Sequence, residues 1–263
     1  MSGWFEFGQW LIHRVKARGP HGVHSPLIFR LITEVLTRRT DARSALLSAE
    51  AHRKLLLSET GFLTIEDFGA GSRTGSSGTR RVCDVARNAS SSPDQLVALW
   101  CLVQDMKPEV ILEFGTNLGL GTMAMAAASP HSKIITMEGS AELAAKAEQA
   151  FQYYHFRQVD CRQGEFDVLL PQLEEEGVRP AFVFLDGNHR KEPTLRYVEQ
   201  LMRMCSDDAV IMLDDIWWSR EMAEAWKEIC GRSDVFLTAD FFHFGLIWNS
   251  KRLRKEHFIV RLP

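Results

Sequence analysis

Residues 110–122 read VILEFGTNLGLGT. The first five residues, Val110–Phe114, are almost all apolar, as in a parallel strand that is buried on both faces. The next segment is rich in glycine and leads into Ala and Met residues that favour a helix. A strand, a glycine loop and a helix in this order allow a backbone to approach a ligand at a helix N-terminus. This stretch therefore predicts an α/β fold with a ligand loop.

The same alternation continues on the C-terminal side of this stretch. Short apolar runs predict strands at 133–138, 156–161, 181–186 and 209–214, and the segments 141–154 and 192–204 have helical spacing. Three further runs, VFLTAD, FGLIWN and HFIVRL, follow one another closely, which predicts antiparallel pairing at one edge. We therefore expect a Rossmann-like, doubly wound, mostly parallel seven-stranded sheet with an antiparallel C-terminal strand pair.

The region before residue 94 has a different pattern. Residues 1–93 are expected to form an N-terminal helical cap or lid, and residues 94–263 the ligand-binding domain. Residues 69–81 are rich in Gly, Ser and Arg and predict a loop. The second glycine segment, Asp67–Gly71, has no helix pattern after it, so we interpret it as a tight turn.

Composition limits the classes of partner. The chain has 263 residues, a net charge of -3 and a pI near 6.3, so no global positive field favours nucleic acid. The five cysteines show no disulfide or zinc spacing, and no segment is long enough to span a membrane. We expect a cytoplasmic protein that acts on a small molecule, without nucleic acid or membrane partners. A homodimer is possible.

Two glutamates end neighbouring predicted strands. Glu113 ends the first and Glu138 the second. An acid at the tip of the second strand can accept hydrogen bonds from both hydroxyls of a ribose, although Glu138 could also cap the helix after it. The pattern of Gly119, Gly121 and Ala124 also matches a dinucleotide fingerprint, but Gly115 holds the place directly after the strand. An NAD(P) site is therefore the alternative.

With these motifs the chain resembles the class I S-adenosylmethionine-dependent methyltransferases, most closely the catechol O-methyltransferase-like branch. The resemblance rests on Glu113–Gly121, IITMEGS, CRQGEFDVLLPQL, VFLDGNH and VIMLDDIWW. The segment GVHSP (22–26) and the last strands also resemble uncharacterised bacterial methyltransferases. The resemblance implies S-adenosylmethionine as the cofactor, with the methionine part near the first loop, the ribose at Glu138 and the adenine at Glu165 and Phe166. The expected cofactor-binding residues are Glu113, Gly115, Thr116, Asn117, Gly119, Thr122, Glu138, Gly139, Gly164, Glu165, Phe166 and Asp186.

Three acids end the fourth and fifth predicted strands. Asp186 follows one strand, and Asp214 and Asp215 end the other, so their carboxylates are expected at the same edge of the sheet. Mg²⁺ would relieve the repulsion between them, and helix capping is the alternative. In metal-dependent relatives an amide stands where this chain has Asp215.

His189 follows Asp186 where catechol-type enzymes carry a lysine base. Histidine has a pKa of about 6.5 in model peptides, so it can take a hydroxyl proton at neutral pH. We expect His189 and Asp186 to be catalytic, and Trp217 and Trp218 to wall the acceptor site or to pack under the cap. The predicted function is O-methylation of a small-molecule hydroxyl. The alternatives are an NAD(P)-dependent oxidoreductase and a non-catalytic methyltransferase-like binding protein.

Overall fold

The computed structural model describes residues 2–66, 78–88 and 90–262. By internal contacts the chain divides into two compact units. We name residues 1–37 with 179–263 the first unit and residues 38–178 the second unit. This division does not coincide with the expected boundary at residue 93, which stays a prediction. The expected turn at Asp67–Gly71 lies outside the described residues.

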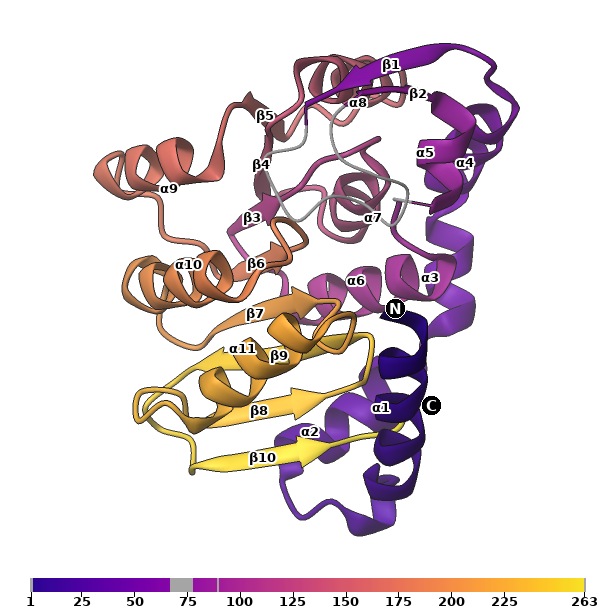
Figure 1. The fold of residues 1–263 in the computed structure, drawn as a ribbon. Helices are drawn as coiled ribbons and strands as arrows, with labels where there is room; N and C mark the ends of the chain where they lie inside the picture. Colours follow the sequence, from indigo (N-terminus) through magenta and orange to yellow (C-terminus); the bar gives the residue numbers. More distant parts are fainter. Residues whose placement is uncertain (1, 67–77, 89, 263) are drawn as a thin grey trace. The chain divides into compact units, whose positions relative to one another are not determined.

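The second unit contains three parallel strands in the order β3-β4-β5 and a separate antiparallel pair, β1 and β2. Helices precede and connect them, as Figure 1 shows. The elements are α3 (Arg39–Ala45), α4 (Leu47–Ser58), β1 (Phe62–Ile65), β2 (Gly78–Arg81), α5 (Val82–Asn88), α6 (Pro93–Met106), β3 (Val110–Phe114), α7 (Leu120–Ala128), β4 (Lys133–Glu138), α8 (Ala141–Tyr153), β5 (Val159–Gln163) and α9 (Phe166–Glu175).

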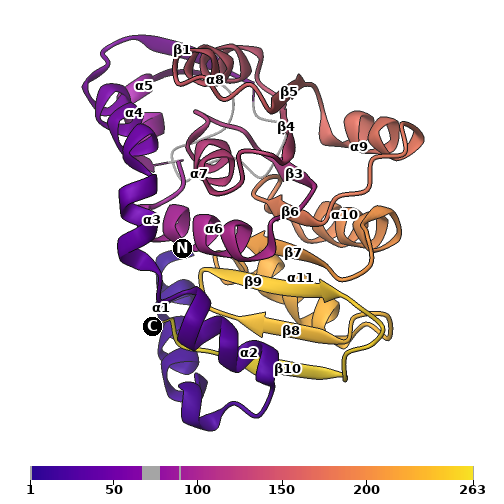
Figure 2. The same ribbon diagram turned by 180° about the vertical axis from the view of Figure 1, so that it is seen from behind.

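The first unit contains five strands in the order β10-β8-β9-β7-β6. Helix α11 covers one face of β8 and β9, and α2 lies on the opposite face, as both Figure 1 and Figure 2 show. The elements are α1 (Ser2–Lys16), η1 (Pro20–Gly22), α2 (Pro26–Arg30), η2 (Leu31–Val35), β6 (Phe182–Leu185), α10 (Lys191–Met204), β7 (Ala209–Asp214), α11 (Arg220–Gly231), β8 (Leu237–Asp240), β9 (Phe244–Asn249) and β10 (Glu256–Ile259).

The main sheet confirms the predicted α/β class and differs in its last strand. It has eight strands, not seven, because β10 pairs with β8 in parallel. The expected antiparallel pair at the C-terminal end is confirmed by β8 and β9, and only β10 departs from it. Strand β9 is bonded on one side to β7 and on the other to β8, both antiparallel, so neither of its edges can accept β10. The chain therefore places β10 beyond β8, where its direction is parallel.

Two other expectations need correction. The predicted strand 156–161 begins only at Val159, since the chain turns before it. The end of the expected loop 69–81 is a strand, because Gly78–Arg81 pairs with Phe62–Ile65. By internal contacts, residues 1–37 group with the C-terminal strands and residues 38–93 with the second unit, and the expected N-terminal cap stays a prediction. A backbone bridge between Arg18 and Val260 ties the first segment to the end of β10.

The strands that carry the expected site are deeply buried. All residues of β6 and β7 are buried, and so are the last four residues of β3. Their side chains leave no room for solvent at the faces of the sheet, so polar side chains that bind a ligand are found where the strands end. Within the described residues, no helix is both long and apolar enough to cross a membrane.

Candidate active site

The loop after β3 has a left-handed backbone at three positions. The φ angles are 90° at Gly115, 50° at Asn117 and 82° at Gly119. The Gly119 N–H donates to the Thr116 carbonyl at 2.8 Å, which closes the turn before α7 begins. A Cβ on Gly119 would lie 2.8 Å from the ring of Phe151, so both the φ angle and the packing require glycine there. The loop is therefore held tightly at the start of α7.

Glu113 is buried in a network of threonine hydroxyls below this loop. Its Oε2 accepts hydrogen bonds from Thr122 at 2.5 Å and from Thr136 at 2.6 Å. The hydroxyls of Thr116 and Thr136 are also 2.6 Å apart. These side chains are almost completely buried, which indicates that they hold β3, β4 and α7 together. Whether Glu113, Thr116 and Thr122 also contact a cofactor stays a prediction.

Glu138 ends β4 directly beside the loop. Its Oε2 accepts from the Asn117 N–H at 2.8 Å, and its Oε1 accepts from the Ser140 N–H at 3.0 Å. The second bond is to the residue before α8, so the helix-capping alternative is part of the geometry. The side chain is partly exposed, so the position of Glu138 is compatible both with the contact to Ser140 and with the predicted ribose contact.

The residues after β5 complete the set of expected cofactor-binding residues in the second unit. The Gly164 N–H donates to the Glu138 carbonyl at 2.9 Å, which joins this turn to β4. Glu165 is exposed, and the partly buried Phe166 ring contacts Phe114 edge-on at 5.3 Å. Strands β3, β4 and β5 are parallel neighbours, so their carboxyl ends lie on the same side of the sheet. The structure brings together there every expected cofactor residue except Asp186, which belongs to the first unit.

His52 supports the same loop and was missed by the sequence analysis. It lies on α4, and its Nε2 is 3.2 Å from the Leu118 carbonyl. Burial lowers the pKa of His52, so the neutral ring donates to this carbonyl. The signal was present in the spacing, because His52 shares the buried face of α4 with Ala49 and Leu56. A histidine on an apolar stripe indicates an internal hydrogen bond.

In the first unit, His189 and Asp186 lie together after β6. His189 Nε2 is 3.5 Å from Asp186 Oδ1, and each side chain is 22% exposed. The imidazole also lies against the Trp218 ring, with centroids 5.6 Å apart. The structure therefore brings together the two expected catalytic residues and one of the expected tryptophans, on the partly exposed side of a strand end.

The expected Mg²⁺ site is not supported. Asp186 and Asp214 do follow neighbouring parallel strands. However, Asp214 is only 7% exposed, and Asp215 has a left-handed backbone (φ 53°) whose N–H donates to the His243 carbonyl at 2.7 Å. Over the ranges that the structure describes, no three His, Cys, Asp or Glu side chains form a group able to hold a metal ion. The donor set of Asp186, Asp214 and Asp215 does not fit a metal centre.

Trp217 is held by a buried carboxylate that the sequence analysis did not identify. Its indole N–H donates to Asp240 Oδ2 at 2.9 Å. Asp240 Oδ1 accepts from the Phe242 N–H at 2.8 Å and lies 3.3 Å from His13 Nε2 on α1. Asp240 ends β8 as a single acid after apolar residues, a weak signal in sequence. This network connects α1 to the loop that follows β7.

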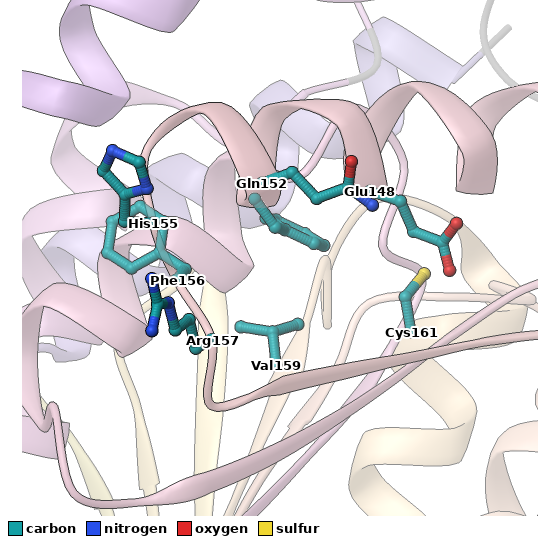
Figure 3. Close-up of a pocket in the computed structure, with 8 residues that line it drawn as sticks. Glu148, Gln152, His155, Phe156, Arg157, Val159 and Cys161 are labelled. Carbon is teal, nitrogen blue, oxygen red and sulfur yellow. The ribbon is translucent and has the colours of Figure 1, made fainter.

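A separate pocket of about 410 Å³ lies in the second unit, beside the edge strand β5. Figure 3 shows side chains from α8, such as Glu148 and Gln152, facing Val159 and Cys161 of β5. None of the expected site residues lines it. Burial raises the pKa of the Cys161 thiol to about 12, so this cysteine is not a nucleophile at neutral pH.

Comparisons with known proteins agree with the motifs. Residues 112–216 match the model of a methyltransferase domain family. A catechol O-methyltransferase from Niastella koreensis is 34% identical over 130 residues, which are 48% of this chain and 58% of that protein. The chain thus aligns with less than two thirds of the length of this relative.

Solved structures share the fold at lower identity. The O-methyltransferase TomG from Streptomyces achromogenes, solved with S-adenosylmethionine, is 21% identical with a TM-score of 0.55, over 62% of this chain and 82% of that one. The methyltransferase PaMTH1 from Podospora anserina, solved with S-adenosylhomocysteine, is 18% identical with a TM-score of 0.59, over 82% of this chain and 96% of that one. The resemblance inferred from the motifs is confirmed: residues 112–216 match a methyltransferase domain family, part of the chain is similar to a catechol O-methyltransferase, and the fold is shared with solved methyltransferases.

Proposed function

We propose that this protein transfers a methyl group from S-adenosylmethionine to a hydroxyl of a small-molecule acceptor. The observation that carries the proposal is the bond from the Asn117 N–H to Glu138, which brings a carboxylate against the glycine loop at the start of α7. The match to a methyltransferase domain and the likeness to a catechol O-methyltransferase support the reaction class.

The same bond argues against a dinucleotide. A pyrophosphate binds through free backbone N–H groups at a helix N-terminus. Here one loop N–H is already bonded to a negative carboxylate, and that charge would repel the phosphates. S-adenosylmethionine has no phosphate, and its positive sulfonium and ammonium groups outweigh its single carboxylate. The loop and Glu138 therefore fit it better than NAD(P).

The first unit supplies the acid–base chemistry in this proposal. His189 takes the proton of the acceptor hydroxyl, while Asp186 faces Nε2, fixes the ring and stabilises its charged form. The cofactor supplies the methyl group, whose bond to sulfur breaks as the bond to the acceptor oxygen forms. Trp218, against the His189 ring, limits its rotation. No step uses Mg²⁺, because the acids do not form a metal site.

Thermal unfolding with added ligands tests the proposal. S-adenosylmethionine and S-adenosylhomocysteine should raise the Tm, because they bind only the native state, and Mg²⁺ should add nothing. A rise with NAD(P) alone would overturn the proposal in favour of an oxidoreductase. A rise with S-adenosylhomocysteine but no release of this product with any phenol or alcohol acceptor would favour the non-catalytic binding protein. A further rise with Mg²⁺ would restore the metal hypothesis.

As part of this proposal, the protein acts in the cytoplasm. All five cysteines are free thiols, as expected in a reducing compartment such as the cytoplasm.

A further inference from the structure

Helix α1 turns its apolar side away from the body of the first unit. Its most buried residue is His13, which is 9% exposed. On the opposite face, Trp4 is 86% exposed, Phe7 52%, Leu11 47% and Val15 87%. These four side chains recur at helical spacing and share one side of the helix. We name Trp4, Phe7, Leu11 and Val15 the apolar face of α1. A helix that packs on a protein core normally has the reverse orientation.

Specific contacts on the other side keep α1 in this orientation. His13 Nε2 lies 3.3 Å from the buried Asp240 carboxylate. The Arg18 N–H, just after the helix, donates to the Ile259 carbonyl at 2.9 Å, and Arg261 donates to the Arg14 carbonyl at 3.4 Å. Both bonds tie the end of α1 to β10 and the residues after it. The apolar face is therefore outward because the polar side is bound.

Positive charge lies near the end of α1, where Arg14 is about 65° and Lys16 about 135° around the helix axis from the centre of the apolar face. Residues 2–18 contain Arg14, Lys16 and Arg18 but only one acid, Glu6. Arg14 and Lys16 are exposed and lie in the last turn of the helix. Trp, Phe and Leu on one side with Lys and Arg on the polar side is the pattern of helices that lie in a membrane interface and bind anionic lipids.

A second copy of the chain fits this face less well. The 15 residues of α1 make a helix about 22 Å long and about 10 Å wide. A standard interface buries about 800 Å² per partner and uses about 20–30 residues a side, many more than the four side chains of this face. Pairing would also bring the basic residues of two copies together. Size and charge both favour a lipid surface.

We propose that helix α1 binds the surface of an anionic bilayer, with Trp4, Phe7, Leu11 and Val15 inserted among the lipids and Arg14 and Lys16 at the headgroups. The sequence analysis expected no membrane partner because no segment can span a bilayer, but a helix that lies in the interface needs no such segment. The proposal is independent of the reaction that the protein catalyses.

Flotation of the full chain with vesicles tests the proposal. The wild type should float with vesicles that mix phosphatidylcholine and phosphatidylglycerol, and much less with phosphatidylcholine alone. Trp4→Ser/Leu11→Ser should lower the partition coefficient by at least about tenfold, since two large apolar side chains are lost. The control Leu47→Ser/Val168→Ser removes two side chains that are 66% and 53% exposed in the second unit and should leave binding unchanged.

A charge variant separates the two parts of the interaction. Arg14→Gln/Lys16→Gln should lower the partition by about tenfold or more and weaken its salt dependence, because each cation near the surface contributes about 1 kcal/mol. Far-UV circular dichroism checks that each variant is folded. The proposal is overturned if the wild type stays unbound with anionic vesicles, or if Trp4→Ser/Leu11→Ser binds like the wild type. A dimer in light scattering that Trp4→Ser/Leu11→Ser converts to a monomer, without vesicle binding, would assign the face to protein pairing instead.

Discussion

At Gly119 the second unit has no room for a side chain. The φ of 82° is a conformation that costs an L-residue about 1–2 kcal/mol, and a Cβ would meet the Phe151 ring at 2.8 Å. Gly119→Ala should therefore raise the Kd for S-adenosylhomocysteine by about tenfold or more, because the loop must shift. Calorimetry measures the Kd. Gly231→Ala is the matched control, since nothing lies within 4 Å of its Cβ. Equal affinity in the Gly119 variant would show that this loop does not bind the cofactor.

His189 is the residue whose replacement should affect the chemical step most directly. His189→Ala should lower kcat by about 10²–10⁴-fold, the usual contribution of a general base, with the Kd for S-adenosylhomocysteine unchanged. The readout is the rate of product release with whichever acceptor the wild type methylates. The control His21→Ala removes an exposed histidine and should have no effect. A His189→Ala enzyme as fast as the wild type would remove His189 from the mechanism.

At the scale of elements, α4 is tied to the cofactor loop by His52. Burial lowers the pKa of His52 below the ordinary value for a histidine, so the unfolded chain binds this proton more tightly than the folded one. The stability that the neutral ring gives is complete above the unfolded pKa and decreases as the pH falls through it. Acid should therefore weaken the contact between α4 and the loop.

The variant His52→Gln isolates this effect. Glutamine can still donate to the Leu118 carbonyl but does not titrate. Between about pH 7.5 and 5 the free energy of unfolding of the wild type should fall more steeply than that of His52→Gln. Burial also lowers the pKa of His257, but this residue contributes equally to both proteins and cancels in the difference. Parallel curves from urea unfolding would contradict the assignment.

At the scale of the whole molecule, the residues expected to bind the cofactor and the acid–base pair belong to different units, each described by itself. The strand ends expected to hold the cofactor lie in residues 38–178, and the acid–base pair lies in residues 179–263. S-adenosylhomocysteine at about 100 times its Kd should stabilise the fold by about 2.7 kcal/mol.

Hydrogen exchange with S-adenosylhomocysteine bound should slow at 115–119, 138–140 and 164–166, while NAD(P) should leave these segments unchanged. Protection elsewhere without protection of these loops would place the ligand site away from β3, β4 and β5.

Sequence determined those parts of the molecule that depend on local pattern. Strands β3, β4, β7 and β9 have the bounds that their apolar runs predict, because a strand buried on both faces needs a continuous apolar segment. The glycine loop was identified because a left-handed turn before a helix requires glycine at fixed places. The sequence also predicts that the parallel strands end on the same side of the sheet, which explains why the expected cofactor residues of the second unit lie together there.

Only the tertiary structure decided which polar groups those residues bind. Glu113 is enclosed by hydroxyls of Thr122 and Thr136, Glu138 bonds the loop as well as α8, and Asp214 and Asp215 do not form a metal site. Strand β10 pairs in parallel because both edges of β9 are taken, and α1 faces outward because His13 binds Asp240. These outcomes depend on contacts between segments far apart in the chain, and hydropathy spacing, which records only whether a side chain is buried, carries no information about its partner.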